Sequence, residues 1–306
     1  MRLSSRLCVV GACAASVITA CRGPAPDLGP VPADLTVVDG GTGTPVSSRD
    51  LAARLGRADA VLLGELHDNP EHHRVRAALL RGAGMRAAPV FEHFTRADVP
   101  LPRPSADETR EAWLDRTGFD RDGWAWPLHA PLVDAALATG APIRGSNLDR
   151  AALRDVVRRG ASAAAAPLAA LVAAAPLDSA ARAGLDADLV AGHCGQLPAA
   201  MIPGMRDAQV VRDAAMADAM LAASQSGVPW LLAGNGHVRR DLAVPRLLAV
   251  ARPQWRVLAV GFLERDSGGR APAVSAMRGR YDLVVVTGAP MGRPDPCAAF
   301  RQPSRR

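Results

Sequence analysis

Seven short apolar runs, separated by longer Ala-, Leu- and Arg-rich segments, constrain the fold of this chain most. Several runs are continuously apolar rather than alternating, which is typical of strands buried on both faces of a parallel sheet. The segments between them have the length of helices, so the pattern predicts an α/β domain with a mostly parallel sheet flanked by helices. The runs are 35–38, 60–63, 89–91, 142–143, 229–232, 255–260 and 283–286.

Two regions lack such runs. Residues 97–140 and 150–225 are rich in helix-forming residues, so we expect part of them to form a small helical subdomain. A chain of 306 residues is long enough for one large core. We therefore expect a single α/β domain over 34–290 that carries this helical insertion, and a loose tail over 291–306.

The N-terminus resembles a bacterial lipoprotein signal. Arg2 and Arg6 precede an apolar stretch that is too short to span a bilayer comfortably. Ile-Thr-Ala-Cys, ending at Cys21, resembles a lipobox whose cysteine takes the lipid; cleavage without lipidation is the alternative. Residues 21–33 are rich in Pro and Gly and predict a tether after a signal over 1–20. We expect a lipid-anchored protein of the bacterial cell envelope, facing the periplasm or the exterior and bound to the membrane through Cys21.

Export determines which cysteines remain in the mature protein and whether they can form a disulfide. Without the leader and the anchor, only Cys194 and Cys297 remain. In an oxidising compartment these two can form a disulfide, but the sequence does not show whether they lie close enough.

The charge of the chain argues against one class of partner. All 36 basic residues are arginine, and the formal net charge is +6. The charge is diffuse, with no basic block that has interleaved aromatic residues. The sequence therefore predicts no nucleic-acid partner.

Polar side chains gather where four of the predicted strands end. Glu65 and His67 follow the second run, Glu92 and His93 the third, and Asn147 and His237 follow the fourth and fifth. A single carboxylate at a strand end is more often a helix cap or an ion-pair partner. In an open parallel sheet, however, the carboxyl ends of neighbouring strands meet in one crevice, where ligands bind. Four such ends together predict one shared site.

The stretch after His67 predicts the start of a helix. Asn69 is a favoured N-cap and Pro70 a favoured first residue. His72 and His73 would then lie in the first turn, where the helix dipole disfavours positive charge. Neutral imidazole is the form that binds metals and haem iron. The alternative is that both histidines lie on an exposed turn.

Several segments, in collinear order over about residues 35–265, resemble the ChaN-like family of haem-binding, iron-regulated lipoproteins, which is related to the TraB and Tiki proteins. The resemblance implies an α/β domain with a small helical domain. It also implies haem held with help from His and Tyr side chains, with a homodimer as one arrangement. The segments are GELHDNPEHHRVRAALL, VFEHF, GSNLDR, HCGQLP with RDAQVVRDAAMADAML, and AGNGHVRRDLAVPRLL. The family's polar positions match Glu65, His67, His73, Glu92 and His237.

The chain also departs from the family pattern. His93 stands where the family usually has Met, and His129 stands near the place of a tyrosine in an aromatic stretch that includes Trp124. The one tyrosine, Tyr281, lies outside the matched region, and we expect it at the amino end of the last strand, opposite the crevice. We therefore expect histidine rather than tyrosine to bind the iron, with His67, His129 and His237 as candidates. Arg239 is a candidate partner for haem propionates.

Two side-chain patterns have simpler explanations. Trp124 and Trp126 can stack on a porphyrin, although aromatic residues beside a Pro-rich turn more often seal a hydrophobic edge. Five residues lie at helical spacing and form a stripe along one helix: Met205, Gln209, Arg212, Met216 and Met220. A plain buried face of that helix explains the stripe better than ligation of iron by methionine does.

Two functional classes follow. The first is a haem-binding lipoprotein of haem or iron uptake, without a reaction of its own. The second is a metal-dependent hydrolase in which Glu65, His67, Glu92 and His237 hold Mn or Zn and a carboxylate activates water. No His-Glu-x-x-His signature supports the second class, and we expect the first.

Overall fold

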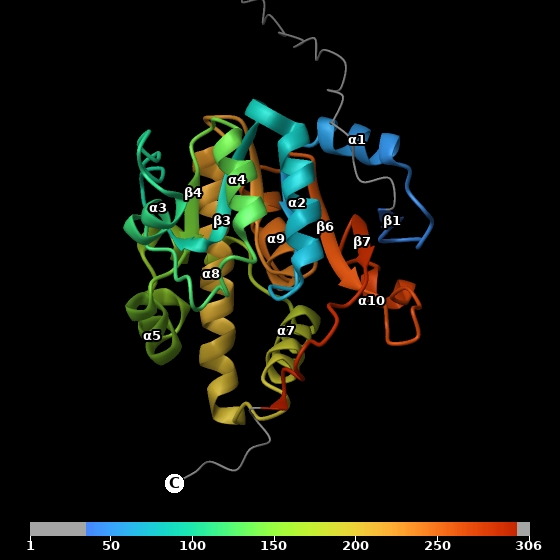
Figure 1. Ribbon diagram of the computed structural model, residues 1–306. Coiled ribbons are helices and arrows are strands. Elements are labelled where there is room, and N and C mark those ends of the chain that lie inside the picture. The colour runs from blue at the N-terminus through green and yellow to red at the C-terminus, as the bar shows by residue number, and fades with distance from the viewer. Residues whose placement is uncertain (1–34, 299–306) are drawn as a thin grey trace, which may run out of the picture.

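The computed structural model describes residues 35–298, which fold around one seven-stranded sheet (Figure 1). The strand order is β1-β7-β6-β2-β5-β3-β4; β1 runs antiparallel to β7, and the other neighbours are parallel. The mostly parallel α/β sheet expected from the sequence is confirmed. The strands are β1 Thr36–Asp39, β2 Ala60–Leu63, β3 Ala87–Thr95, β4 Arg144–Asn147, β5 Val228–Leu232, β6 Val257–Glu264 and β7 Leu283–Thr287.

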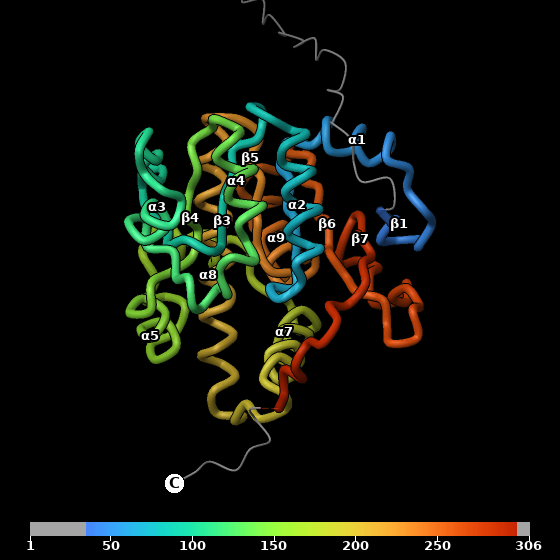
Figure 2. The backbone as a smooth tube through the Cα atoms, viewed as in Figure 1, coloured from blue at the N-terminus to red at the C-terminus, as the bar shows by residue number. Residues whose placement is uncertain are grey.

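Helices cover both faces of the sheet. Helices α1 to α4 pack on one face, where α2 and α4 lie side by side (Figures 1 and 2), and α5, α6, α8 and α9 pack on the other. The central strand β2 is buried along its whole length, as its continuously apolar sequence predicts. The helices are α1 Ser48–Arg57, α2 Pro70–Ala83, α3 Arg110–Arg116, α4 Ala130–Ala138, α5 Arg150–Arg159, α6 Ala166–Ala174, α7 Ser179–Gly192, α8 Ile202–Ala223, α9 Val244–Ala251 and α10 Val274–Met277.

The helix-rich regions divide between these layers. The C-terminal half of α8 packs across β3, β4 and β5, whereas its N-terminal part extends past the sheet with α5 and α7 beside it (Figure 2). Helices α5, α6 and α7 all contact α8. The helices of 97–140 instead pack on the sheet face that α2 covers.

Strand β3 extends beyond its apolar run, and β4 begins only after its run, which ends at Ile143. Strand β3 continues to Thr95, so Glu92 and His93 lie within it rather than after it, and Asn147 is the last residue of β4. The pairing of β3 with β4 shifts register between Phe91 and Thr95 and resumes where Thr95 faces Asn147. That resumed pairing keeps the polar end of β3 in the sheet.

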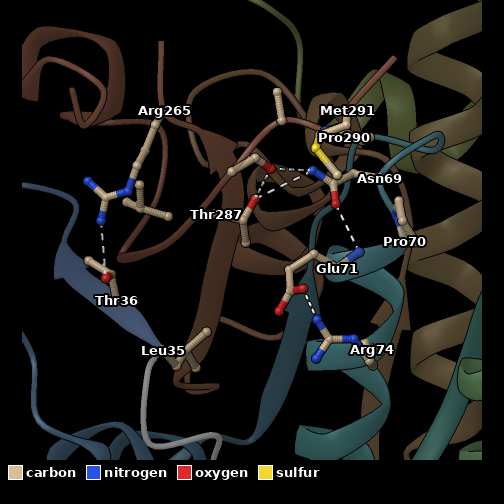
Figure 3. A pocket seen from close by; sticks show the side chains of 13 residues that line it. Leu35, Thr36, Asn69, Pro70, Glu71, Arg74, Arg265, Thr287, Pro290 and Met291 are labelled. Atoms are coloured by element: carbon tan, nitrogen blue, oxygen red, sulfur yellow. Dashed lines mark hydrogen bonds and ion pairs between the residues drawn. The ribbon is translucent and has the colours of Figure 1, made fainter. Parts of the chain in front are cut away.

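Helix α2 begins as the sequence predicts. Asn69 Oδ1 accepts hydrogen bonds from the backbone N–H groups of Glu71 (2.9 Å) and His72 (3.3 Å), and Pro70 is the first helical residue. Asn69 Nδ2 donates to the carbonyl of Gly288 (3.0 Å), just after β7, which Figure 3 shows from close by. The start of α2 is therefore tied to the carboxyl edge of the sheet.

The segment from 291 to 298 is held to the domain, which corrects the expectation of a loose tail from 291 onward. Cys297 forms a disulfide with Cys194, with their Cα atoms 5.7 Å apart. Arg293 pairs with Glu264 (2.6 Å) and Asp68 (2.7 Å). One covalent bond and two ion pairs fix a segment whose composition alone indicated a coil.

The predicted lipoprotein signal and the last residues of the chain lie outside the part that the structure describes. The leader, Cys21, the tether and residues 299–306 all lie outside residues 35–298. Between residues 35 and 298, none of the helices has the length and apolar character needed to cross a membrane.

Candidate functional site

Four imidazoles and one guanidinium surround the carboxylate of Glu65, which is 1% exposed. One oxygen, Oε1, lies 2.6 Å from His67 Nδ1, 3.1 Å from His93 Nε2 and 3.6 Å from His129 Nε2. The other, Oε2, pairs with Arg76 and lies 3.0 Å from His73 Nδ1. We call this group the Glu65 cluster; its members are Glu65, His67, His73, Arg76, His93 and His129.

The cluster draws on four elements. Glu65 and His67 follow β2 at its carboxyl end, and His93 comes from β3. Residues three apart on a helix share a face, so α2 directs both His73 and Arg76 inward. His129 is the N-cap residue of α4, which packs on α2. The cluster therefore forms where this pair of helices meets the sheet.

Burial separates His67 from the other members. The His67 side chain is 45% exposed, whereas those of His73, His93 and His129 are at most 1% exposed. Burial lowers the pKa of His73 to about 4 and also lowers the pKa values of His93 and His129. These rings are therefore neutral at physiological pH. The sequence predicts a neutral His73 from the helix dipole, but desolvation is the main cause.

Three of the buried rings are incompletely hydrogen-bonded. Among the described residues, neither ring nitrogen of His129 has a hydrogen-bond partner, and nor do Nδ1 of His73 and Nδ1 of His93. The ring centroids of His93 and His129 lie 4.4 Å apart, and the His93 centroid lies 4.5 Å from that of Trp124. A buried polar group without a partner costs about 1–3 kcal/mol.

A second polar group adjoins the first, and we call it the Glu92 cluster. Glu92 Oε1 accepts a hydrogen bond from Arg212 Nη2 (2.5 Å), and Arg212 Nε donates to Asn147 Oδ1 (3.1 Å). His237 Nε2 lies 3.4 Å from Glu92 Oε1, and His237 Nδ1 lies 2.6 Å from Asp213 Oδ1. The members are Glu92, Asn147, Arg212, Asp213 and His237.

Charge dominates this second cluster. Burial alone would raise the pKa of Glu92, but His237 and Arg212 hold it well below its usual range. Burial would likewise lower the pKa of His237, yet Glu92 and Asp213 raise it. The Glu92 cluster is thus an internally compensated ion network, unlike the mostly neutral rings around Glu65.

Gly234 lies between the two clusters. Its N–H donates to Glu92 Oε2 (2.7 Å), and a Cβ at this position would lie 2.9 Å from His67 Nε2. The four residues expected to share one site, Glu65, His67, Glu92 and His237, therefore lie at the same edge of the sheet. They divide into two adjacent pairs with different partners.

Two expected residues lie elsewhere. Arg239 is 6% exposed, and its guanidinium pairs with Asp188 and Asp241 rather than with either cluster. Tyr281 packs in the core on the α8 side of the sheet, whereas α2 and α4, on the opposite side, carry part of the Glu65 cluster. The Tyr281 hydroxyl lies 3.5 Å from the carbonyl of Asn235, just after β5. Tyr281 is therefore separated from the crevice by the thickness of the sheet. It is not separated by the length of the strands, because β7 begins opposite Val260, in the middle of β6.

Three contributing residues were not among the expected ones. Arg76 carries only a weak sequence signal, its spacing of three residues from His73. Arg212 belongs to the helical stripe expected to be a plain buried face, and Asp213 is next to it. Met216, from the same stripe, is indeed fully buried. Along α8, the stripe therefore contributes Arg212 to the ion network around Glu92 and Met216 to the hydrophobic core.

Open clefts of two kinds lie at this edge. One, of about 630 Å³, borders both clusters and has a size common for cofactor sites. The other, of about 500 Å³, lies beside β7, and the polar groups in it pair with each other, as Arg74 does with Glu71 (Figure 3). The first cleft is the candidate site; it is lined in part by His93, Trp124, Asn147, Arg150 and Arg212.

Comparisons with known proteins agree with this architecture. The family described as "Haem-binding uptake, Tiki superfamily, ChaN" matches residues 51–248. ChaN of Campylobacter jejuni, whose structure shows cofacial haem binding, is 17% identical over 83% of this chain and 97% of its own, with a TM-score of 0.63. None of the curated proteins matches the chain.

Two other solved structures are more distant. A mutant of the erythromycin esterase EreC is 16% identical over 78% of each chain, with a TM-score of 0.39. The type III effector HopBA1 is 13% identical over 86% of this chain and 98% of its own, with a TM-score of 0.37. At these scores neither bears on function.

Proposed function

Because the chain belongs to the family described as haem-binding uptake, Tiki superfamily, ChaN, we propose that it binds haem beside the Glu65 cluster, with His67 as the iron ligand. The observation that carries this assignment is the exposure of His67. Its side chain is 45% exposed, whereas the other imidazoles of the two clusters are buried. A porphyrin is too wide to enter the packed interior and needs a donor at the surface.

The surroundings of His67 suit a metal ligand. Its Nδ1 lies 2.6 Å from Glu65 Oε1, so the Nδ1–H donates to the carboxylate and Nε2 keeps its lone pair. A ligating histidine usually donates its other N–H to such an acceptor, which fixes the ring and raises its basicity. Gly234 has no side chain to crowd Nε2. When bound there, haem would supply an iron centre that accepts a nitrogen ligand of this kind.

Neighbouring side chains suit the rest of the cofactor. The Trp124 ring centroid lies 5.0 Å from that of His67, and Trp124 lines the adjoining cleft. Arg150 lines the same cleft, with a side chain 86% exposed. Arginine pairs with carboxylates in a bidentate manner, so Arg150 is suited to a propionate in place of Arg239.

The other expected donors have less support. His129 and His237 are 1% and 4% exposed, and the second is engaged with Asp213. Tyr281 is 7% exposed and packs in the core on the α8 side of the sheet, so its phenol is not presented to a haem at the surface. We therefore assign the role of iron ligand to His67 alone.

A relative suggests how two copies of the chain share haem. The ChaN of C. jejuni binds haem cofacially, so we propose that two copies of this chain bring their His67 faces together around haem.

The N-terminus suggests where the protein acts. We also propose that Cys21, outside the described residues, carries a lipid that holds the protein in the bacterial envelope for haem or iron uptake. Replacing Cys21 with Ser should abolish incorporation of labelled fatty acid, and unchanged labelling would overturn the anchor.

Haemin titration followed by absorption tests the assignment. The wild type, the His129→Ala variant and the Tyr281→Phe variant should bind saturably with an imidazole-type spectrum, and the His67→Ala variant should not. His193, at the end of α7, offers the matched control His193→Ala. Binding lost in Tyr281→Phe but kept in His67→Ala would refute the histidine assignment. No saturable binding by the wild type would refute haem binding.

The hydrolase alternative has weaker support. It requires Glu65, His67, Glu92 and His237 to face one Mn or Zn ion. Arg212 and the N–H of Gly234 already engage Glu92, and Asp213 engages His237. These four residues are not a free ligand set.

A further inference from the structure

Part of the Glu65 cluster has the composition and spacing of a metal site. One ligand atom from each of Glu65, His67, His93 and His129 can be chosen so that all four lie within 4.8 Å of one another. Tetrahedral zinc has bonds of about 2.0–2.2 Å to nitrogen and oxygen, which places its ligand atoms roughly 3.3 Å apart. The distances of 2.6, 3.1 and 3.6 Å from Glu65 Oε1 to the three imidazole nitrogens bracket that spacing.

His129 supplies a second, independent observation. It is 1% exposed, points into the cluster, and makes no hydrogen bond through either ring nitrogen to the described residues. A folded chain rarely buries an imidazole with both nitrogens unpartnered, because nothing offsets its desolvation. A bound cation would give Nε2 a partner.

We propose that Glu65, His67, His93 and His129 bind one divalent transition-metal ion of the zinc class, separately from haem. His67 faces Glu65 through Nδ1 and the surface through Nε2. A neutral imidazole has one lone pair, so binding the ion through Nδ1 moves the ring proton to Nε2, and the haem-free protein is the form that takes the ion. The set of three imidazoles and one carboxylate oxygen resembles catalytic zinc sites in its nitrogen-rich composition. The exposed side of His67 is the route by which the ion enters.

The surroundings also determine which metals bind. Arg76 pairs with Glu65 Oε2, so the only carboxylate of the site is already neutralised. Hard cations such as Mg²⁺ and Ca²⁺ need several oxygen ligands with negative charge, which this site does not offer. Imidazole-preferring ions such as Zn²⁺ and Co²⁺ depend less on that charge. The site should therefore select strongly for the second group.

Equilibrium dialysis with metal analysis tests the proposal on full-length, haem-free protein treated with chelator. The wild type should hold one Zn²⁺ per chain, excess Mg²⁺ or Ca²⁺ should not displace it, and Co²⁺ should give a nitrogen-rich ligand-field spectrum. Changing an outer-shell partner costs about 10–100-fold in metal affinity, so loss of a direct ligand in His129→Phe should cost at least about 100-fold. Phenylalanine keeps the ring packing against His93 but removes both nitrogens.

Two controls separate metal binding from folding and from haem. His93→Met removes a ligand with little change in volume and should lose Zn²⁺ even if His129→Phe does not fold, while His193→Ala should bind normally. His129→Phe should still bind haemin, because His129 is not the proposed iron ligand. Retention of stoichiometric Zn²⁺ in a folded His129→Phe or His93→Met variant would overturn the site. So would an equal affinity for Mg²⁺, or no Zn²⁺ binding by the wild type.

Discussion

The side chains of Glu65 and Arg76 form an ion pair that is completely removed from solvent. Such a pair contributes little net stability over an apolar core, but removing one partner leaves a buried charge uncompensated. Glu65 is also the acceptor that orients His67. One carboxylate thus supports both the packing of α2 and the candidate ligand.

Replacing Glu65 with Gln should therefore be costly. We expect the free energy of unfolding to fall by about 3–5 kcal/mol, because the guanidinium of Arg76 loses its counter-charge inside the protein. Urea denaturation measures the change. The double variant Glu65→Gln with Arg76→Met should recover part of the loss. A single variant as stable as the wild type would show that the ion pair does not matter for the fold.

Replacing Gly234 with Ala should affect the site more than the fold. The added Cβ would lie 2.9 Å from His67 Nε2, so the half-exposed ring must move. The φ of Gly234 is −62°, which alanine adopts without strain. We expect haemin affinity to fall about tenfold or more, equivalent to about 1.4 kcal/mol, with little change in stability. Gly192→Ala is the matched control, since a Cβ there meets nothing within 4 Å; equal affinities for the two variants would contradict the idea.

Much of the scaffold could be predicted because its signals are local. Continuous apolar runs mark strands buried on two faces, and Asn69 with Pro70 marks the start of α2. The gathering of Glu65, His67 and Glu92 at one edge follows from strand direction alone. These features depend on short segments and on a general rule of parallel sheets.

The remaining features depend on tertiary packing. His129 joins the cluster only because α4 packs on α2, and nothing in its neighbouring sequence states that contact. The split between the clusters arises from partners on α8, Arg212 and Asp213, whose helical stripe also fits a plain core. The pairing of Cys194 with Cys297 links positions 103 residues apart. Such contacts are fixed by the whole fold and not by local pattern.

Reduction of that disulfide should destabilise the domain. It closes a loop of 103 residues, and in the chain-entropy view a loop of this length restricts the unfolded ensemble strongly. We expect the free energy of unfolding to fall by about 2–4 kcal/mol on reduction. Urea denaturation with and without reductant measures the effect. The Cys194→Ser variant should be as stable as the reduced wild type and should not respond to reductant; a wild type that does not respond would contradict the prediction.

The ionisation of Tyr281 can be followed by absorbance without overlap from other tyrosines, because it is the only tyrosine in the chain. The chain also has no lysine that would titrate in the same pH range. Burial raises the pKa of Tyr281 to about 12, whereas an unfolded tyrosine ionises near about 10. The phenol is neutral in both states below about pH 10, so its contribution to stability is fully present there. Between about pH 10 and 12 the unfolded chain loses the proton first, and stability should fall as pH rises.

An alkaline titration of tyrosinate absorbance tests this expectation. The folded protein should titrate with a midpoint near pH 12, and the urea-unfolded chain near about pH 10. Circular dichroism at each pH establishes that the fold persists through the transition. The Tyr281→Phe variant should show no such absorbance change and should keep its haemin affinity. A folded-state midpoint near about 10 would place the phenol in contact with solvent and reopen its role as a ligand.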